Sequence, residues 1–346
     1  MARIVVAGAG AIGASIAYHL VLRGTDDEVI LCDRGEVACG ATGKAMGGVR
    51  QQFTTEPEVR LAQASARFFA GLGAPLYEQV GYLFLATTEA GSAELEERRR
   101  LQVALGVPVE NLDPSVVSGL RTDDVFGALI CREDGVADPT AVTRHLVDEA
   151  TGHGAGLMEG TDARELDRDV LIVACGAASP ELIDVPIRPL VRQLVDTETV
   201  AGLPPALPMT IEAQTTFHFR GVGDGLRLAM VEPKPRWGSE EVVDQALVLD
   251  WLERLAHRYP PAAGIGVARA WAGLYDMTPD AHPIIGWVED GVYAACGFSG
   301  HGFMQSPAVG AAVAEELISG SSSFDLSPYR LERFADGAVF PETLVL

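Results

Sequence analysis

The most constraining feature of this sequence is a G-x-G-x-x-G motif that begins at Gly8. It follows Ile4 to Ala7, a β-branched apolar run typical of a buried parallel strand, and it precedes a helix-like stretch over residues 14–22. In such a motif the first glycine permits a tight turn. The second, Gly10, lets a pyrophosphate approach the backbone, and the third, Gly13, lets helix and strand pack closely. The chain therefore starts with a predicted dinucleotide-binding βα unit.

The next strand-like run, Glu28 to Cys32, ends at Asp33, which lies 20 residues after Gly13. A carboxylate in this place accepts hydrogen bonds from both ribose hydroxyls of an adenosine and repels a 2′-phosphate. No second G-x-G-x-x-G follows a strand. We therefore expect one dinucleotide site and no separate NAD(P)H domain.

Composition limits the class of protein. The chain has 346 residues, enough for a large core and two domains. Its net charge of −22 argues against nucleic acid and membranes as partners, and an anionic substrate needs local positive charge to bind. The 5 cysteines have no metal-like spacing, so we expect no metal. No apolar run reaches transmembrane length, and we expect a cytoplasmic protein.

The pattern of elements predicts an α/β fold in which a Rossmann-like nucleotide-binding domain is assembled from separated segments. Mostly antiparallel strands are inserted between those segments as a substrate-binding domain. The expected nucleotide-binding segments are 1–80, 132–186 and 265–346, and the expected substrate-binding segments are 81–131 and 187–264. Strands are expected at 81–85, 128–131, 170–177, 187–199, 216–230 and 292–297, and helices at 57–70, 93–105, 138–150, 242–259 and 306–318.

Two segments rich in small residues indicate close backbone contact with a ligand. Many of the residues from Gly35 to Gly48 are glycine or alanine, which suits a backbone lying against a flat or phosphorylated group. A second glycine-rich turn, Gly297 to Gly302, opens a helix, so its N–H groups and the helix dipole point at whatever binds there.

Three blocks, residues 4–53, 170–177 and 271–310, carry a resemblance that covers most of the chain. The last block contains W-A-G-L-Y-D-M-T-P-D from Trp271, then H-P-I-I-G, then G-F-S-G-H-G-F-M from Gly297. It closely resembles the FAD-dependent amine oxidoreductases of the D-amino-acid oxidase superfamily. Within that superfamily the sequence is similar to sarcosine oxidases of the β-subunit type and to glycine oxidases.

The resemblance implies a Rossmann-like FAD-binding domain of the glutathione-reductase type, with FAD as cofactor. It implies hydride transfer to flavin N5 from a carbon next to the nitrogen of an amine substrate, after which the imine hydrolyses. Oxygen or an external acceptor then takes the electrons, and an oligomer is compatible with the family. The residues it implies for cofactor binding are Gly8, Gly10, Ala11, Ile12, Gly13, Asp33, Arg34, Gly43, Lys44, Ala45, Met46, Gly47, Ala174, Gly176, Gly300, His301, Gly302, Phe303 and Met304.

Four residues are implied to contact the substrate: Arg50, Tyr275, His301 and Met304. Arg50 matches an arginine that grips the substrate carboxylate, for which a planar fork of donors is well suited. His301 is expected to contact flavin or substrate rather than act as a general base. Lys44 matches a segment beside the isoalloxazine ring, where a lysine polarises the flavin. Arg50, His301 and Lys44 are thus the predicted catalytic residues.

The sequence also departs from the family pattern. Gly273 stands where monomeric sarcosine oxidases carry the cysteine that anchors flavin, so we expect non-covalent FAD. Met304 replaces a carboxylate-binding lysine, and Tyr275 replaces the arginine of glycine oxidases, which favours a bulkier N-substituted amino acid. Arg227 aligns loosely with an oxygen-activating lysine. The short segment 155–169 predicts an unusual adenine pocket.

The leading hypothesis is oxidation of the C–N bond of a secondary-amine amino acid, such as an N-alkyl glycine. One alternative is glycine-oxidase-like removal of a carboxymethyl group from a bulkier amine. Another is an NAD-dependent dehydrogenase, which predicts no tightly held chromophore. A non-catalytic flavin-binding subunit or assembly factor predicts a flavin that no amine reduces.

Overall fold

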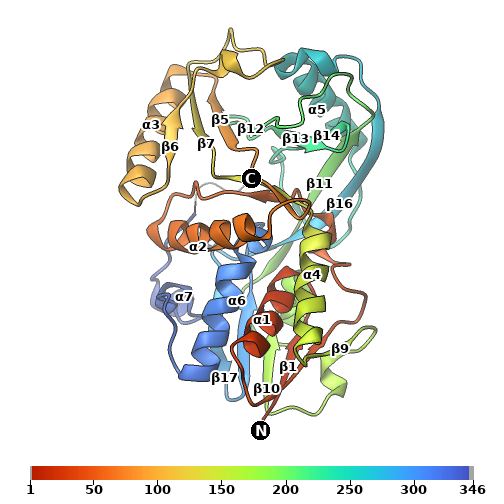
Figure 1. Cartoon of the computed structure of the whole chain (residues 1–346), viewed down its shortest axis with the longest axis vertical. Coiled ribbons are helices and arrows are strands. Elements are labelled where there is room, and N and C mark those ends of the chain that lie inside the picture. Colours follow the sequence, from red (N-terminus) through yellow and green to blue (C-terminus); the bar gives the residue numbers. More distant parts are fainter. Residues whose placement is uncertain (1, 343–346) are drawn as a thin grey trace.

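A computed structural model describes residues 2–342 of the chain. Two β-sheets lie at opposite ends of an elongated molecule (Figure 1). A six-stranded sheet with helices α1, α4 and α6 forms the lower half of the view, and a nine-stranded sheet with helices α3 and α5 forms the upper half. The long strands β11 and β16 run from the middle of the molecule into the upper half, so they connect the two halves.

The six-stranded sheet has the strand order β17-β18-β10-β1-β2-β9. Strand β1 pairs in parallel with β10 and β2, and its residues from Ile4 to Ala7 are all buried. Burial on both faces explains why these strands are continuously apolar in sequence. The strands are β1 (Arg3–Ala7), β2 (Glu28–Cys32), β9 (Gly156–Met158), β10 (Val170–Val173), β17 (Ile284–Glu289) and β18 (Val292–Cys296).

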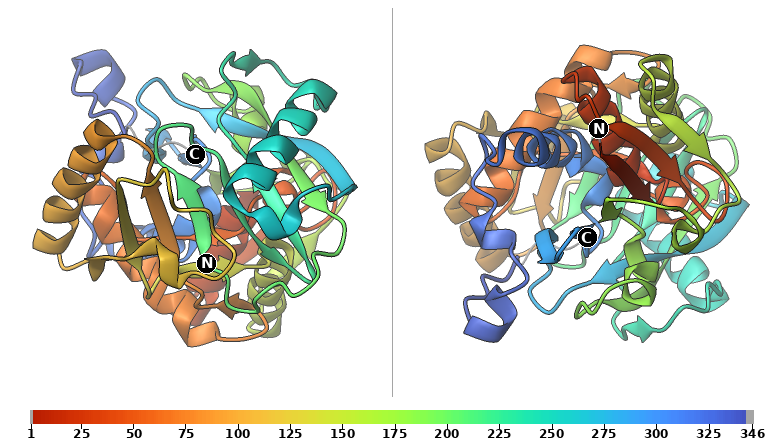
Figure 2. Two further views of the ribbon diagram at one scale, coloured as in Figure 1. Left: turned by 90° about the horizontal axis from the view of Figure 1, so that it is seen from above. Right: turned by 90° about the horizontal axis from the view of Figure 1, so that it is seen from below.

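Three helices cover this sheet: α1 (Ala11–Leu22), α4 (Pro139–Gly152) and α6 (Gly302–Ser319). The first and last of them lie side by side although they are far apart in sequence (Figure 2). They approach so closely that a Cβ on Gly310 would lie 2.2 Å from Ser15 Oγ. In the expected manner Asp138 caps α4, accepting hydrogen bonds from the N–H groups of Thr140 and Ala141.

The nine-stranded sheet has the order β15-β11-β14-β13-β12-β5-β7-β6, and β16 pairs with β11. Apart from the parallel pair of β5 and β12, its neighbouring strands are antiparallel. Helices α3 (Glu89–Ala104) and α5 (Gln245–Arg258) accompany it. Its strands are β5 (Tyr82–Ala86), β6 (Val109–Asn111), β7 (Gly127–Cys131), β11 (Arg188–Thr197), β12 (Met209–Glu212), β13 (His218–Val222), β14 (Gly225–Ala229), β15 (Arg236–Trp237) and β16 (Val267–Met277).

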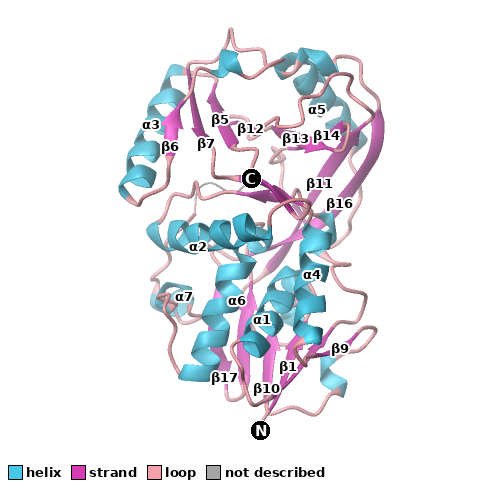
Figure 3. Cartoon of the chain, in the orientation of Figure 1, coloured by secondary structure: helices cyan, strands magenta, loops and turns pink. Residues whose placement is uncertain are grey.

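A small third sheet and helix α2 (Glu56–Leu72) lie between the two halves (Figure 3). This sheet has the order β3-β8-β4, and β3 ends one residue before Arg50. Its strands are β3 (Gly48–Val49), β4 (Tyr77–Glu78) and β8 (Gly135–Ala137), and the short helix α7 (Arg333–Asp336) follows late in the chain. No helix within residues 2–342 combines the length and apolarity needed to cross a membrane.

The predicted fold class is confirmed, while two details differ from the prediction. Hydrogen bonding places β16 in the nine-stranded sheet, whereas the predicted boundary at residue 265 assigns it to the nucleotide-binding domain. Helix α6 begins at Gly302, earlier than the expected residue 306, although Pro307 lies inside it. Proline lacks the N–H that would bond the Phe303 carbonyl, and Ser306 Oγ donates to that oxygen instead, at 2.9 Å. The helix therefore continues through the proline.

Candidate active site

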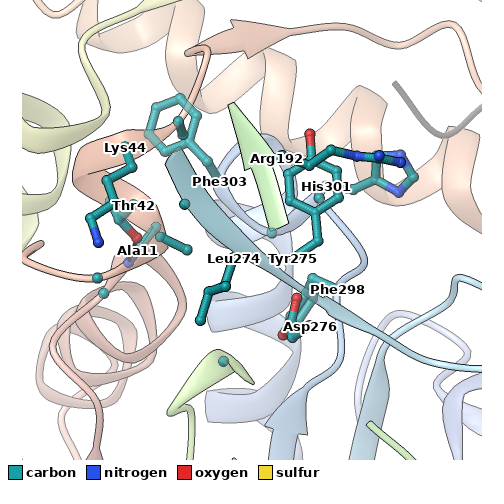
Figure 4. Close-up of a pocket in the computed structure, with 18 of the residues that line it drawn as sticks. Ala11, Thr42, Lys44, Arg192, Leu274, Tyr275, Asp276, Phe298, His301 and Phe303 are labelled. Atoms are coloured by element: carbon teal, nitrogen blue, oxygen red, sulfur yellow. Dashed lines mark hydrogen bonds between the residues drawn. The ribbon is translucent and has the colours of Figure 1, made fainter. Parts of the chain in front are cut away.

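A cavity of about 360 Å³ lies between the two large sheets. Its lining residues come from the turn after β1, the segment 39–50, the end of β10, strands β11, β13, β14 and β16, and the start of α6. In the close-up of the cavity, Ala11, Thr42 and Lys44 lie on one side and Arg192, Tyr275 and His301 on the other (Figure 4). The cavity thus brings together the three sequence blocks that carried the family resemblance.

The glycine turn after β1 packs closely against neighbouring backbone, with no room for side chains at Gly8 and Gly13. Gly8 has a φ of +106°, and a Cβ there would lie 2.4 Å from the Ala174 carbonyl oxygen. A Cβ on Gly13 would lie 1.9 Å from the Gly8 carbonyl oxygen. Gly10 lines the cavity, and its own Cβ would meet Thr42 Oγ1 at 3.1 Å. Only glycines let helix α1 start this close to the strand and leave its N-terminus open toward the cavity.

Asp33 stands at the end of β2 and lines the same cavity. One carboxylate oxygen accepts the N–H of Ala9 and the other accepts the N–H of Gly35, each at 2.8 Å. These bonds hold the carboxylate beside the glycine turn, where a ribose of a bound dinucleotide is expected. The neighbouring Arg34 is exposed and pairs with Glu181 at 2.7 Å.

The segment from residue 42 to 47 is held by the nine-stranded sheet through its carbonyl oxygens. Trp271 Nε1 donates to the Lys44 carbonyl at 3.1 Å, and Arg220 Nε donates to the Met46 carbonyl at 2.6 Å. At the other end of the segment, the Ala11 N–H donates to Thr42 Oγ1 at 3.0 Å. The segment therefore bridges the two halves of the molecule and its position is fixed from both sides.

Two cations associated with this segment have carboxylate partners. Lys44 lines the cavity, and its ammonium group hydrogen-bonds Glu241. Arg227, the expected counterpart of an oxygen-activating lysine, forms a bidentate pair with Asp196 at 2.8 and 2.9 Å and is absent from the cavity lining. Its guanidinium group thus links strand β14 to strand β11 and does not contact the cavity.

Asp276, at the end of β16, shapes the turn that leads into α6. Its carboxylate accepts the N–H groups of Gly297 at 2.7 Å and Ser299 at 3.1 Å, and burial raises its pKa. Gly297, Ser299 and Gly300 all have a positive φ, so the turn needs this external support. The result is a helix N-terminus directed at the cavity with its backbone conformation fixed.

His301 is the N-cap residue of α6 and is 3% exposed. Its backbone N–H donates to the Phe298 carbonyl at 2.9 Å. Its ring meets the Phe53 ring edge to face, with the centroids 5.1 Å apart. The imidazole is therefore buried at the cavity wall and packs against Phe53.

Arg50 is 1% exposed and lines the cavity. Its Nη1 donates to the Gln52 carbonyl at 2.5 Å, and its guanidinium carbon lies 4.2 Å from the centre of the Phe53 ring. Burial lowers its pKa, while the nearby acids Glu342 and Asp134 oppose that change. Burial also raises the pKa of Asp134 to about 6.

Several lining residues were not predicted from the sequence. Arg192 lies on β11, with its guanidinium carbon 5.6 Å from the centre of the Tyr275 ring. His218 lies on β13, and because a carbonyl only accepts, its Nδ1–H donates to the Thr216 carbonyl at 2.7 Å. Burial lowers the pKa of His218 to about 4, so its ring is neutral at pH 7. A charged residue within the apolar alternation of β11 was the signal for Arg192.

Most of the predicted site residues share this one cavity. Three predicted cofactor residues are not among its lining: Gly13 and Gly43 lie behind the wall against neighbouring backbone, and Arg34 points to Glu181. The predicted residues that do line it are Gly8, Gly10, Ala11, Ile12, Asp33, Lys44, Ala45, Met46, Gly47, Arg50, Ala174, Gly176, Tyr275, Gly300, His301, Gly302, Phe303 and Met304.

These residues fit a flavin dinucleotide. The Gly8–Gly10 turn leaves a cradle that a Cβ would disturb, which suits a pyrophosphate, and Asp33 suits an adenosine ribose. The α6 N-terminus lines the same cavity, and its backbone donors would stabilise negative charge on a flavin bound beside it. Fold and cavity together define a dinucleotide-binding redox protein of the α/β class.

Comparison with known proteins gives the family. The FAD dependent oxidoreductase (DAO) family matches residues 3–316, and the chain belongs to this family, whose cofactor is FAD. Mouse mitochondrial sarcosine dehydrogenase is 24% identical over 96% of this chain and 41% of its own length. The 4-methylaminobutanoate oxidase (formaldehyde-forming) of Paenarthrobacter nicotinovorans is 27% identical over 96% of this chain and 46% of its own length. The chain thus spans less than half the length of these two relatives.

Other relatives match end to end. Glycine oxidase of Geobacillus kaustophilus is 25% identical over 95% of this chain and 96% of its own length. Among solved structures, L-proline dehydrogenase from P. horikoshii superimposes with a TM-score of 0.91 at 26% identity, covering 98% of this chain and 99% of that one. The crystal structure of glycine oxidase from Geobacillus kaustophilus superimposes with a TM-score of 0.85 at 23% identity, covering 96% of this chain and 99% of that one. This match supports the fold described above.

Proposed function

We propose that the protein oxidises the C–N bond of a secondary-amine amino acid, such as an N-alkyl glycine. The observation that carries this proposal is one cavity that extends from the Gly8–Gly10 turn to Arg50 and His301. When bound, FAD supplies the acceptor for the hydride that leaves the carbon next to the nitrogen. The resulting imine hydrolyses, and oxygen or an external acceptor takes the electrons.

In this proposal the residues of the chain bind and orient. Arg50 donates to the substrate carboxylate, for which its planar fork is suited. His301, fixed against Phe53, positions substrate or flavin without taking a proton. Lys44 contributes positive charge on the flavin side of the cavity. Its hydrogen-bond partner Glu241 partly neutralises that charge. The backbone donors of the α6 N-terminus stabilise negative charge without an acidic side chain.

The lining favours a substrate larger than sarcosine. Methionines 46, 209, 230 and 304 all line the cavity, together with Leu194 and Leu274. Methionine fills irregular apolar space and adapts to different partners, so these residues suit an apolar substituent on the substrate. A bulky N-substituted amino acid is therefore the substrate class we propose, with carboxymethyl removal as the variant closest to glycine oxidase.

FAD is proposed to bind non-covalently. Gly273 lines the cavity with the Lys44 side chain against it, where its Cβ would lie 3.1 Å from Lys44 Cβ, and it offers no thiol for a flavin link. Acid precipitation of the purified yellow protein should leave the colour in the supernatant. Colour that stays with the pellet would contradict this part of the proposal.

The test of the function is anaerobic mixing of the purified flavoprotein with a panel of amino acids and N-alkyl glycines. Loss of the oxidised flavin absorbance with secondary-amine amino acids is the expected result. Reduction by N-carboxymethyl amines alone favours the glycine-oxidase-like reaction. A bound flavin that no amine of the panel reduces would identify a non-catalytic flavin-binding subunit and overturn the proposal.

A further inference from the structure

Arg192 is a buried cation that forms no ion pair with any residue from 2 to 342. It is 9% exposed, and its Nε and Nη1 have no hydrogen-bond partner among residues 2–342. Burial of a charged group is costly unless it is paired and hydrogen-bonded. A guanidinium group in this state is therefore ready for an anionic ligand.

Three carboxylates on β11 or in the cavity lining already have other partners. Asp196, on the same strand, pairs with Arg227, and Glu241 of the cavity lining hydrogen-bonds Lys44. Asp276 accepts the backbone N–H groups of the turn before α6. The protein carries 48 acidic residues against 26 basic ones, so the absence of a partner for Arg192 within the described residues is not due to a shortage of carboxylates.

The sheet places Arg192 in the cavity lining. Its partner in the register between β11 and β16 is Gly273, and Leu190 stands opposite Tyr275. Directly opposed residues lie on one face of an antiparallel pair, so Tyr275 is a diagonal neighbour of Arg192 on the same face. Figure 4 shows both side chains together with His301 on the same side of the cavity. The guanidinium group therefore lies at the cavity beside Tyr275, while the Lys44 side chain packs against Gly273.

Arg50 and Arg192 differ in their surroundings. Arg50 donates to a carbonyl, and the acids Asp134 and Glu342 lie near enough to affect its titration. Within the described residues, Nε and Nη1 of Arg192 have no such hydrogen bond, and no carboxylate forms an ion pair with its guanidinium group. His218, which lies near both guanidinium groups, is neutral and supplies no negative charge. Of the two arginines, Arg192 thus has the greater need for a ligand carboxylate.

We propose that Arg192 binds a carboxylate of the substrate, as a specificity-determining residue in addition to Arg50. The identity of the ligand as an amine carboxylate rests on the proposed function. An arginine fork binds both oxygens of a carboxylate, so a substrate with no carboxylate should bind weakly. Removal of a desolvated charge from such a pair typically weakens binding by roughly 30-fold or more.

The test uses acetate, an unreactive carboxylate, with the FAD-loaded protein at constant ionic strength. Binding is followed through the perturbation of the flavin absorbance spectrum, which requires no turnover. Arg192→Gln should raise the acetate Kd by about 30-fold or more, and Arg192→Lys by less, because lysine keeps the charge without the fork. Arg188→Gln is the matched control, because Arg188 lies on the same strand but stacks on Trp237 outside the cavity.

Two further measurements make the test decisive. An Arg192→Gln protein that binds acetate like the wild type overturns the proposal. Unchanged acetate binding combined with a raised FAD Kd overturns it as well and makes Arg192 a cofactor contact. Without FAD, Arg192→Gln should have a Tm equal to or above that of the wild type, because an unpaired buried charge has been removed. Acetate binding tests the role of Arg192, and flavin reduction by amines tests the proposed function. Failure of either proposal can therefore be recognised independently of the other.

Discussion

The two walls of the cavity are built from different chemical groups. The glycine wall consists of the Gly8–Ile12 turn, the segment 39–48 and the turn 297–302, and it presents mainly backbone and small side chains. The sheet wall comes from the strands of the nine-stranded sheet, and it presents large side chains. Its polar members are Tyr82, Arg192, His218 and Tyr275, and its apolar members include Leu194, Met209 and Leu274. A wall made of backbone suits a cofactor that is the same throughout a family. A wall made of side chains can change its substrate specificity through substitutions that leave the fold intact.

The largest effect should come from damage to the glycine wall. A Cβ in Gly13→Ala would meet the Gly8 carbonyl oxygen at 1.9 Å, so the start of α1 must move away from β1. Overpacking of this kind costs about 1–3 kcal/mol or more, and here it also distorts the dinucleotide turn. The variant should purify with little or no FAD, measured by the ratio of flavin to protein absorbance. Gly152→Ala, where the added Cβ meets nothing within 4 Å, is the control and should keep its FAD.

On the other side of the cavity, Arg50→Ala should change substrate binding and leave FAD in place. Loss of one partner of a desolvated charge pair costs about 2–5 kcal/mol, so the apparent KM should rise roughly 30- to several-thousand-fold. Arg50→Lys should recover part of the loss, because an ammonium group lacks the planar fork. Steady-state kinetics with a substrate from the anaerobic panel gives the answer, and unchanged kinetics for Arg50→Ala would remove Arg50 from the site.

The interior behind the glycine wall should respond to pH. Burial raises the pKa of Glu58 to about 7, and its carboxylate accepts hydrogen bonds from Gln305 on α6 and from Tyr329 at 2.9 Å. The folded protein therefore keeps a proton that the unfolded chain, with a glutamate pKa of about 4.3, releases as the pH rises. Stability from this group is lost between about pH 4.3 and 7, by about 4 kcal/mol at most.

Thermal unfolding of Glu58→Gln at several pH values checks this expectation. The Tm of the variant, relative to the wild type, should rise from pH 5 to pH 8, because glutamine cannot ionise. Glu56→Gln is the control, since Glu56 is exposed on the same helix and pairs with Arg60 at its surface. A Tm difference that stays constant with pH would show that Glu58 is not protonated in the folded protein.

The smallest effect is expected at His301, the N-cap residue of α6. If His301 positions substrate or flavin, His301→Asn should slow anaerobic flavin reduction by roughly 10-fold or less, since general-base catalysis typically contributes about 100- to 10,000-fold. The pH profile should still show the ionisation of the amine substrate. Abolished reduction with FAD and substrate still bound would make the histidine the base.

The contrast between the walls also explains what the sequence could predict. Gly8, Gly10 and Asp33 lie within one short segment, so their spacing alone defines a turn and an acid at known places. Tyr82, Arg192, His218 and Tyr275 come from strands β5, β11, β13 and β16, and only the pairing of those strands brings them together. Strand pairing over such distances is not encoded in local spacing.

The same physical reason accounts for the missed elements of the fold. Strand β16 was not predicted as a strand, because its residues are only partly buried and its apolar alternation is weak; its partner β11 stabilises it along its whole length. Helix α1 and strand β1 were readily predicted, because most of their residues are buried and apolar. Within the site, Arg192 stands between Leu190 and Leu194 on one face of β11, and this exception to the apolar pattern was visible in the sequence.

The division of roles between the two walls is tested most directly by the affinity for FAD. FAD is titrated into the cofactor-free protein, and quenching of flavin or protein fluorescence gives the Kd for the wild type, Gly13→Ala and Arg192→Gln. The account predicts a Kd for Arg192→Gln within about twofold of the wild type and a Kd for Gly13→Ala raised by about 10-fold or more, in line with a cost above 1.4 kcal/mol. Equal losses of FAD affinity in the two variants would contradict it, because the sheet wall would then hold the cofactor as well.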